Sequence, residues 1–363
     1  MWRGIAATVL GLAVAALSCK REDARSESRG ADTGTAEVGL GAMRSDWGPD
    51  KKVAFERGRA LFVRVFTPEV GLGPGFNDRS CVACHHVPVA AGGGDLANAV
   101  KLLVDPAHNE IIPWPAHQTS GGGLAPPLPG THHTVFASPP LLGLGFIDEI
   151  PGEELRAACD VHPFAADGVV GHANIRGDGA IGKFGQKANV ASLRRFVEAA
   201  LLGELGLTSA LATDVLHDDD GTADPEVSSG EADDFATFLA GLAPPPAAPP
   251  HEGSAVFTTV GCIACHSTKT AGREIGAYSD FCVHAMGPEF DVGARDHTAL
   301  GDEFRSAPLW GIRYRTRFLH DLRATTLDEA IRAHGGEAKR TRERYEILDA
   351  PTRARLLEFV SRL

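Results

Sequence analysis

Hydrophobic residues recur at helical spacing in several parts of the chain, and each such segment predicts a helix. In Val53 to Phe66 the apolar positions follow this spacing, and Pro68 marks the end of the helix. In Leu193 to Leu205 they form one face of an amphipathic helix. Further helices are predicted in a segment that starts at Pro151 and at Glu231 to Leu242, Gly253 to Gly261, Leu327 to Ala333 and Thr352 to Leu363.

Other stretches lack this pattern. The segment from Gly92 to Gly145 is rich in Gly, Pro and His and is predicted to be largely loop. The acidic run His217 to Glu226 resembles a calcium-binding loop in composition only, because its spacing does not match one. Calcium therefore has no support there, and a solvated loop is favoured.

The helical pattern occurs twice in a similar order, which indicates a duplicated unit. A Gly-x-Ala-apolar-Phe step runs from Gly58 to Phe62 and again from Gly253 to Phe257, each time before a CxxCH motif. The Pro-rich run Ala243 to Pro250 cannot be helical and separates the two units. The predicted division is a first half at 51–243, a linker at 244–250 and a second half at 251–363.

The first residues resemble an export signal. Trp2-Arg3 supplies a short positive start, and Ile5 to Leu17 is an apolar stretch too short to span a membrane. It leads to Ser18-Cys19, which resembles a bacterial lipoprotein cleavage site with a lipid anchor on Cys19. Ordinary signal cleavage that discards Cys19 is the alternative. We expect a lipoprotein-type signal at 1–19, a polar flexible tether at 20–50, and an exported, periplasmic protein anchored to a membrane.

Charge and composition narrow the class of partner. The 363 residues carry a net charge of −12, which argues against nucleic acid because phosphate binding needs a basic surface. Hydrophobic residues make up 43% of the chain and charged residues 23%, as in an ordinary globular protein.

Two motifs of the form CxxCH carry the chemistry, Cys81-Val-Ala-Cys84-His85 and Cys262-Ile-Ala-Cys265-His266. Each supplies two thiols one helical turn apart, which form thioethers with the vinyl groups of haem, and then an imidazole for the iron. A zinc ribbon would place its two CxxC arms about 15–20 residues apart, whereas these motifs lie in different halves. A thioredoxin-like site has no use for the trailing histidine. The sequence therefore predicts two covalently attached haem c groups.

Two cysteines are left over. Of the seven in the chain, Cys19 is assigned to the lipid and four belong to the motifs, so Cys159 and Cys282 remain. An oxidising compartment allows leftover thiols to pair. Their distance in space cannot be read from the sequence, so a disulfide and two free thiols are both open.

The chain resembles the bacterial di-haem cytochrome c peroxidase superfamily, and within it the di-haem oxidoreductase branch. The resemblance covers roughly Val53 to Leu363. The segments that carry it are GRALF, FTPEVGLGPGFNDRSCVACH, PPLLGLGFIDEIP, GHANI, IGKFGQKA, YSDFCVHAMGP, FRSAPLWGI, FLHDLRATTLDEAI and HGGEA. It implies a mainly α fold of two cytochrome c-like domains, each with one covalent haem, with long loop-rich insertions in the first.

The resemblance also implies ligands for the irons. His85 and His266 follow the motif cysteines and would bind one iron each. In the family the second ligand of the C-terminal haem lies on the helix after a His-Asp-Gly turn; here that turn starts at His320, and the matching position is His334. Met286 is the alternative ligand, and the resemblance favours His334.

For the N-terminal haem, the resemblance implies a pocket acid. Asp148 occupies the motif's acidic position, with Glu149 beside it. The alternative is that both carboxylates cap the helix that starts at Pro151. The candidates for a histidine that binds the resting iron instead are His108, His117, His132, His133, His162 and His172.

The chain departs from the family in two segments. The segment FGQKA has Gln186 where an aromatic Trp is common, and Trp310 is the candidate to replace that ring between the haems. The second departure is the turn His320-Asp321-Leu322, in which Leu322 replaces the glycine of the family's His-Asp-Gly turn.

The favoured function is reduction of hydrogen peroxide at the N-terminal haem, with electrons relayed through the C-terminal haem from a small cytochrome or cupredoxin donor. Two alternatives stay open. One is an electron-transfer di-haem cytochrome without catalysis. The other is a high-valent haem enzyme that oxidises a protein side chain.

Overall fold

The structure is a computed structural model that describes residues 39–113, 117–118, 130–210 and 221–363. The predicted signal, the lipid anchor at Cys19 and most of the predicted tether lie outside these residues, as does the start of the acidic run at 217–220. Among the described residues, no helix is long and apolar enough to cross a membrane.

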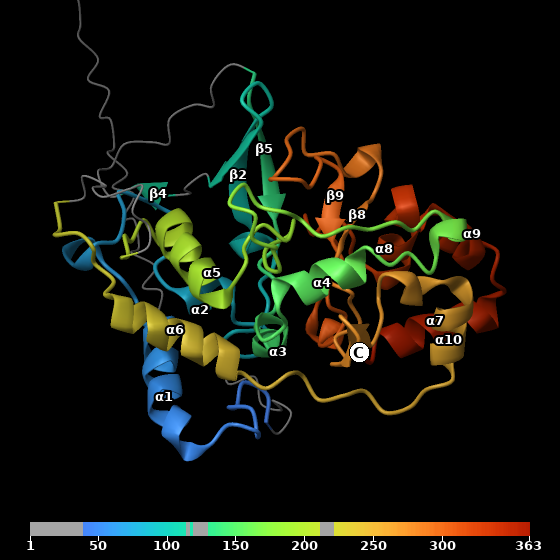
Figure 1. Ribbon diagram of the computed structural model, residues 1–363, viewed down its shortest axis with the longest axis horizontal. Helices are drawn as coiled ribbons and strands as arrows, with labels where there is room; N and C mark the ends of the chain where they lie inside the picture. The colour runs from blue at the N-terminus through green and yellow to red at the C-terminus, as the bar shows by residue number, and fades with distance from the viewer. Residues whose placement is uncertain (1–38, 114–116, 119–129, 211–220) are drawn as a thin grey trace, which may run out of the picture. The chain divides into compact units, whose positions relative to one another are not determined.

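In the first half, the blue α1 and the yellow α6 cross each other at an angle in Figure 1. The Ser228 side chain caps α6, and Glu231 completes a capping box with the Ser228 backbone. The helices of this half are α1 (Pro49–Val63), α2 (Cys81–Cys84), α3 (Leu144–Asp148), α4 (Gly152–Cys159), α5 (Leu193–Ala200) and α6 (Ser229–Gly241).

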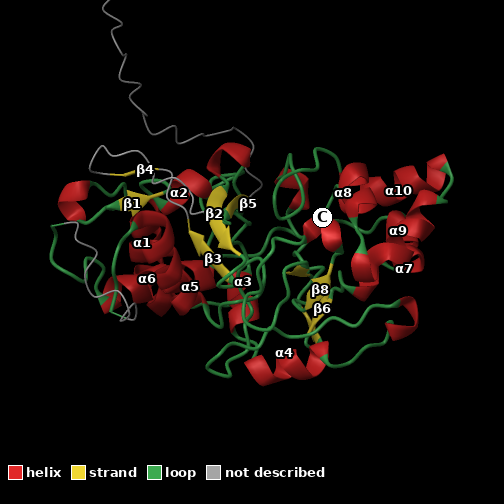
Figure 2. Cartoon of the chain, turned by 90° about the horizontal axis from the view of Figure 1, so that it is seen from above, coloured by secondary structure: helices red, strands yellow, loops and turns green. Residues whose placement is uncertain are grey.

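The helices of the second half lie side by side in both views (Figures 1 and 2). They are α7 (Gly253–Val260), α8 (Leu327–Ala333), α9 (Lys339–Glu346) and α10 (Ala350–Val360). A capping box between Thr326 and Glu329 starts α8. Short 3-10 turns lie at Pro68–Val70, Leu96–Asn98, Ala165–Asp167, Cys262–Ala264, Pro288–Phe290, Ile312–Tyr314 and Gly336–Ala338, and a π-helical turn at Leu201–Leu205 continues α5.

The predicted loop between Gly92 and Gly145 contains a sheet, so that prediction was wrong for much of the segment. Strand β2 (Val100–Asp105) pairs antiparallel with β3 (Glu110–Pro113) on one side and β5 (His132–Phe136) on the other. Val104, Leu103 and Leu102 of β2 are buried. A short aliphatic strand was obscured by the Gly, Pro and His content around it, because composition averages over the whole segment.

The remaining strands form short two-stranded pairs. They are β1 (Gly75–Phe76) with β4 (His117–Gln118), β6 (Lys269–Thr270) with β7 (Arg273–Glu274), and β8 (Val283–Ala285) with β9 (Glu303–Arg305). All of them are antiparallel.

All the segments predicted to be helical contain helices, and α8 has the predicted bounds. Three helices were missed: α2, α3 and α9. The four-residue α2 and the five-residue α3 are too short to show a helical period, and α3 begins at the end of the predicted loop. The segment of α9, KRTRERYE, has almost no apolar periodicity to indicate it.

Gly58 and Gly253 allow their helices to cross a second helix at close range. A Cβ on Gly58 in α1 would lie 2.0 Å from the Asp234 carbonyl oxygen and 2.7 Å from Phe238 Cβ in α6. A Cβ on Gly253 in α7 would lie 2.2 Å from the Arg355 carbonyl oxygen in α10. The repeated sequence step therefore has the same structural reason in both halves: each glycine sits where another helix touches its backbone.

Aromatic rings fill the space beside both crossings. The centroids of Phe62 and Phe238 are 5.3 Å apart in the first half, and those of Phe257 and Phe359 are 5.5 Å apart in the second. Separations in this range are those that aromatic pairs prefer.

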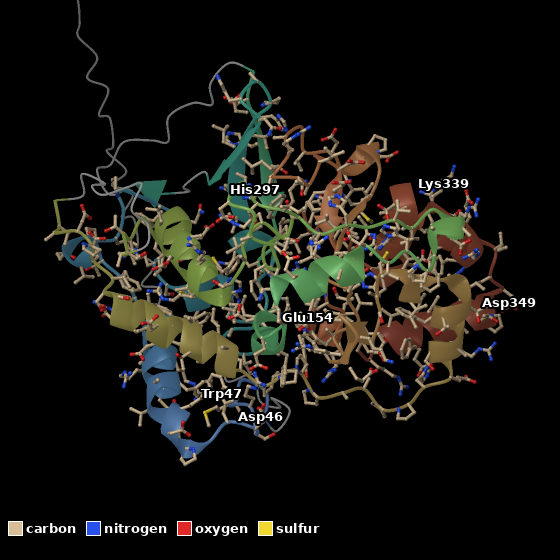
Figure 3. All side chains as sticks on the ribbon, in the orientation of Figure 1. Asp46, Trp47, Glu154, His297, Lys339 and Asp349 are labelled. Carbon is tan, nitrogen blue, oxygen red and sulfur yellow. A yellow bond between two sulfur atoms is a disulfide. The ribbon has the colours of Figure 1, made fainter. Side chains whose placement is uncertain are left out.

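The two halves are joined by packing, by a disulfide and by ion pairs. Trp310 and Phe281 of the second half are buried in the main hydrophobic cluster of the first. Cys159 at the end of α4 and Cys282 form a disulfide, which decides the open question. On the same helix Glu154, labelled in Figure 3, accepts a 2.7 Å hydrogen bond from Arg273 of β7.

The last residues of the predicted tether belong to the fold. Arg44 is 4% exposed, pairs with Asp46 and Glu149 at 2.7 Å each, and lies 3.7 Å from the centroid of the Phe146 ring. Met43 pairs with Leu242 through a β-bridge. The folded region therefore begins before residue 51, and Asp46 and Trp47 lie beside the start of α1 (Figure 3).

We predict that Gly58→Ala and Gly253→Ala each destabilise the protein by about 1–3 kcal/mol, because the added methyl group meets the backbone of the crossing helix. Denaturant unfolding measures this. Gly230→Ala in α6 is the matched control, since its Cβ would meet nothing within 4 Å. It should stabilise slightly, by up to about 1 kcal/mol. Equal effects of all three substitutions would contradict the explanation.

Candidate functional site

A cavity of about 230 Å³ contains the residues of the second motif. Cys262, Cys265 and His266 line it, and His334 at the end of α8 lines it as well. The apolar part of the wall includes Phe257, Leu309, Ile312, Leu327, Ile331 and Val360. The cavity therefore brings the motif together with the predicted second ligand.

The two histidines of the cavity are oriented by backbone carbonyl groups. His266 Nδ1 lies 3.0 Å from the Tyr278 carbonyl oxygen, and His334 Nδ1 lies 2.7 Å from that of Ala330. Burial lowers the pKa of both, and the pKa of His266 falls to about 4 with a second contribution from the charge of His334. Both imidazoles are therefore neutral at pH 7, and each keeps Nε2 for another partner, as metal-binding histidines do.

Met286, the alternative ligand, also lines this cavity. It follows β8, and its backbone N–H donates to the Asp302 carbonyl oxygen at 3.0 Å. Its side chain packs against the buried Phe290, Val292 and Phe304. The cavity thus contains both candidates for the second ligand.

The first motif forms α2 and the residue after it. His85 Nδ1 lies 3.0 Å from the Pro139 carbonyl oxygen and 3.2 Å from that of Gly92. Burial lowers the pKa of His85 to about 4, so this imidazole is also neutral at pH 7. The Phe62 ring from α1 lies beside it, with centroids 6.3 Å apart.

The two motifs are connected through one proline. Pro139 accepts the hydrogen bond of His85 and, with Pro140, lines the cavity of the second motif. Trp310 lines the same cavity, and its ring packs closely over Gly143. Gln186 also lines it and donates from Nε2 to the Ala137 carbonyl oxygen at 3.0 Å.

Asp148 and Glu149 lie outside the residues that line this cavity. Asp148 Oδ1 accepts a 3.1 Å hydrogen bond from the Leu193 N–H at the start of α5 and lies 3.7 Å from Lys183 Nζ. Glu149 pairs with Arg44. Neither carboxylate accepts a hydrogen bond from the first N–H groups of α4 among the described contacts, and Asp148 instead accepts from the first residue of α5, so the capping alternative is wrong for α4.

Several of the candidate histidines have other partners. His172 Nε2 lies 3.0 Å from Glu303, His132 Nε2 lies 3.0 Å from the Val292 carbonyl oxygen, and His108 Nδ1 lies 2.7 Å from Asp105. His133 and His162 are exposed, and the His117 side chain lies outside the described part of the structure.

A family model described as "Di-haem oxidoreductase, putative peroxidase" matches residues 134–363. The chain belongs to the di-haem oxidoreductase family. The matched region begins after the first CxxCH motif and contains the second, together with His334 and Met286. No curated protein matches the chain.

Three solved structures are similar to this di-haem oxidoreductase. Hydrazine synthase of Kuenenia stuttgartiensis is 14% identical, with a TM-score of 0.42, over 91% of this chain and 98% of that one. The diheme peroxidase BthA of Burkholderia thailandensis is 16% identical, with a TM-score of 0.41, over 77% of this chain and 70% of that one. A variant of BthA is 17% identical, with a TM-score of 0.40, over 80% of this chain and 72% of that one.

The residues of this di-haem oxidoreductase fit the two haem groups that the family implies. The four motif cysteines are free thiols, and the histidine that follows each pair is neutral. The cavity is largely apolar, and Arg315 on its wall has a buried Nη2 with no hydrogen-bond partner among the described residues. A mostly apolar cavity with free thiols, neutral imidazoles and an unpaired cation suits a porphyrin that carries acidic groups.

Two kinds of residue escaped the sequence analysis. Arg305 and Arg315 line the cavity, but their spacing in FRSAPLWGIRYR matches no motif. Glu204 lies on the π-helical turn after α5 and accepts a hydrogen bond from Asn77 Nδ2. Burial raises the pKa of the Cys84 thiol to about 12, and the charge of Glu204 contributes to this rise, so Glu204 lies near the first motif. A π-helical turn often marks a functional site, but no local sequence pattern indicates this one.

We predict that Glu204→Gln raises stability at pH 8 by on the order of 1 kcal/mol and leaves it unchanged at pH 4. Burial raises the pKa of Glu204 to about 7. The folded chain therefore holds a proton that the unfolded chain has released, and wild-type stability falls as pH rises from about 4.5 to 7. Denaturant unfolding at both pH values measures the effect.

The exposed Glu343→Gln on α9 is the control for this measurement. It should follow the wild-type pH dependence. A Glu204→Gln protein with the same pH dependence as wild type would show that the buried carboxylate does not titrate in this range.

Proposed function

We propose that the chain is an exported di-haem c oxidoreductase that reduces hydrogen peroxide at the N-terminal haem, with electrons relayed through the C-terminal haem. The first half (51–243) and the second half (251–363) would be the two cytochrome c-like domains. The observation that carries the proposal is Pro139, which accepts the hydrogen bond of His85 and also lines the cavity with His266 and His334. The two predicted haem sites are therefore separated by little more than one residue.

Cys81 and Cys84 would attach the first haem, and Cys262 and Cys265 the second. A bound haem would supply an iron that exchanges single electrons and can reduce peroxide. The chain's own part is to hold His85 and His266 by their Nδ1 atoms, so that each imidazole is neutral and presents Nε2. His334, held in the same way, would be the second protein ligand of the haem in the second half.

Both ring nitrogens of His172 are bonded, to the Ala173 carbonyl oxygen and to Glu303, so binding an iron would cost it one of these bonds. His108 and His132 each have one ring nitrogen bonded and stay candidates for the resting iron of the first half. The pocket acid stays a prediction, because Asp148 bonds to the Leu193 N–H and Glu149 pairs with Arg44. The donor would be a small cytochrome or cupredoxin, and the anchor would be a lipid on Cys19.

The function is tested by peroxide turnover after one-electron reduction of the purified protein. We expect two haem c groups per chain by pyridine haemochrome and mass, and peroxide consumption that requires the one-electron-reduced state. Asp148→Asn should slow turnover at least tenfold if this carboxylate moves the proton. Glu153→Asn, at an exposed position nearby on α4, is its control. Only low-spin EPR signals, two in the oxidised state and one in the half-reduced state, without peroxide reaction, would instead establish an electron carrier.

We predict that His334→Ala abolishes one low-spin EPR signal and converts that haem to the high-spin form, because the second axial ligand is lost. Met286→Leu is the matched test of the other candidate on the same cavity and should leave the signal in place. The reverse result would assign Met286 as the ligand.

A further inference from the structure

Arg315 is a half-buried cation in the cavity wall that has no partner among the described residues. No described residue forms a hydrogen bond or ion pair with its guanidinium group, and its Nη2 is inaccessible to solvent. Burial alone lowers its pKa, with no carboxylate to offset it. A buried, unpaired charge is costly, so an arginine in this position implies a ligand that brings the opposite charge.

Arg305 lines the same cavity and is only partly satisfied. Its Nε donates to the Gly185 carbonyl oxygen at 2.9 Å and its Nη1 to that of Ser306 at 3.3 Å. The guanidinium carbon lies 4.9 Å from the centroid of the Phe281 ring. In the described part of the chain, no carboxylate is within ion-pair distance of this side chain, and its Nη2 donates to no residue.

The protein itself supplies no acid for these two arginines. Among the described residues that line the cavity, Glu337 is the one carboxylate. Its oxygens accept hydrogen bonds from the Val170 and Ala285 N–H groups, and His284 Nδ1 lies 2.9 Å away. Glu337 is thus already bound, and the positive charge of Arg305 and Arg315 is left for the ligand.

We propose that Arg305 and Arg315 bind the two propionate carboxylates of the haem attached at Cys262 and Cys265. The proposal rests on the covalent haem of the proposed function and goes beyond it by placing the acidic edge of that haem. Haem carries two carboxylates. Three arginines line the cavity, and Arg342 has a carboxylate partner in Glu346 at 4.0 Å, so Arg305 and Arg315 are the two that have none among the described residues. A guanidinium group presents parallel N–H donors that fit a carboxylate.

This pairing has a consequence for electron transfer. The oxidised haem iron carries one more positive charge than the reduced iron, so an uncompensated propionate nearby favours the oxidised state. Arg305 and Arg315 cancel that effect and keep the potential of the second haem higher than it would be without them. Because Arg305 Nε bonds to Gly185 of the first half, the acidic edge is fastened to both halves.

The test is a spectroelectrochemical titration of the holoprotein with resonance Raman spectra of both haems. Arg315→Leu should lower the midpoint potential of the haem whose low-spin signal depends on His334, and should shift its propionate bending band. Arg315→Lys keeps the positive charge but loses the parallel N–H donors of the guanidinium group. It should lower the midpoint potential less than Arg315→Leu does, and should still shift the propionate bending band. Arg355→Leu removes the same charge from an exposed position on α10 and should change neither.

Unchanged potentials and propionate bands in Arg315→Leu would overturn the proposal. If the Arg315→Leu protein does not acquire its haems, the propionate bending bands of Arg315→Gln and Arg305→Lys are measured instead. Wild-type band positions in both variants would overturn the proposal. Added chloride or another small anion that restores the wild-type band in Arg315→Lys would also overturn it, since the site would then bind a free anion. A wild-type chain without two haems would refute the proposed function instead.

Discussion

The rest of the structure depends on two close helix crossings. In each half, a glycine in the helix that leads to a CxxCH motif lets a second helix touch its backbone, and a pair of phenylalanine rings fills the space beside it. In the second half α7 ends at Val260, and its C-cap residue Gly261 directly precedes Cys262, so the crossing fixes where the motif begins. A larger residue at Gly253 would separate α7 from α10 and move the thiols relative to the groups that hold His266.

Backbone carbonyl groups orient the rings of three histidines. His85, His266 and His334 each place Nδ1 against a main-chain oxygen, and burial keeps each ring neutral. A main-chain acceptor does not depend on the side chain at its position, so the ring orientation follows from the path of the chain alone. Pro139 is part of this arrangement on one side and part of the cavity wall on the other, which is why the fold and the two sites cannot be treated separately.

The sequence predicted whatever is encoded locally. The CxxCH motifs identified the thiols and their histidines, and the capped segment Leu327 to Ala333 formed the expected helix because its start signals are within the segment. Features that depend on distant parts of the chain were missed or left open. The disulfide joins cysteines 123 residues apart, and the environment of Arg315 is made by residues scattered along the second half. No local pattern reports on either, because burial and pairing are set only after the chain has folded.

The disulfide between Cys159 and Cys282 sets a condition on how the chain matures. Cys262 and Cys265 lie between these two cysteines in the sequence, so thiols oxidised in order of synthesis would pair Cys159 with one of them. A thioether has neither a thiolate nor a sulfur–sulfur bond and takes no part in disulfide exchange. Under the proposed covalent attachment, haem that reaches the second motif early removes both competitors and leaves Cys282 for Cys159. Haem supply would then control the covalent joining of the two halves during biogenesis.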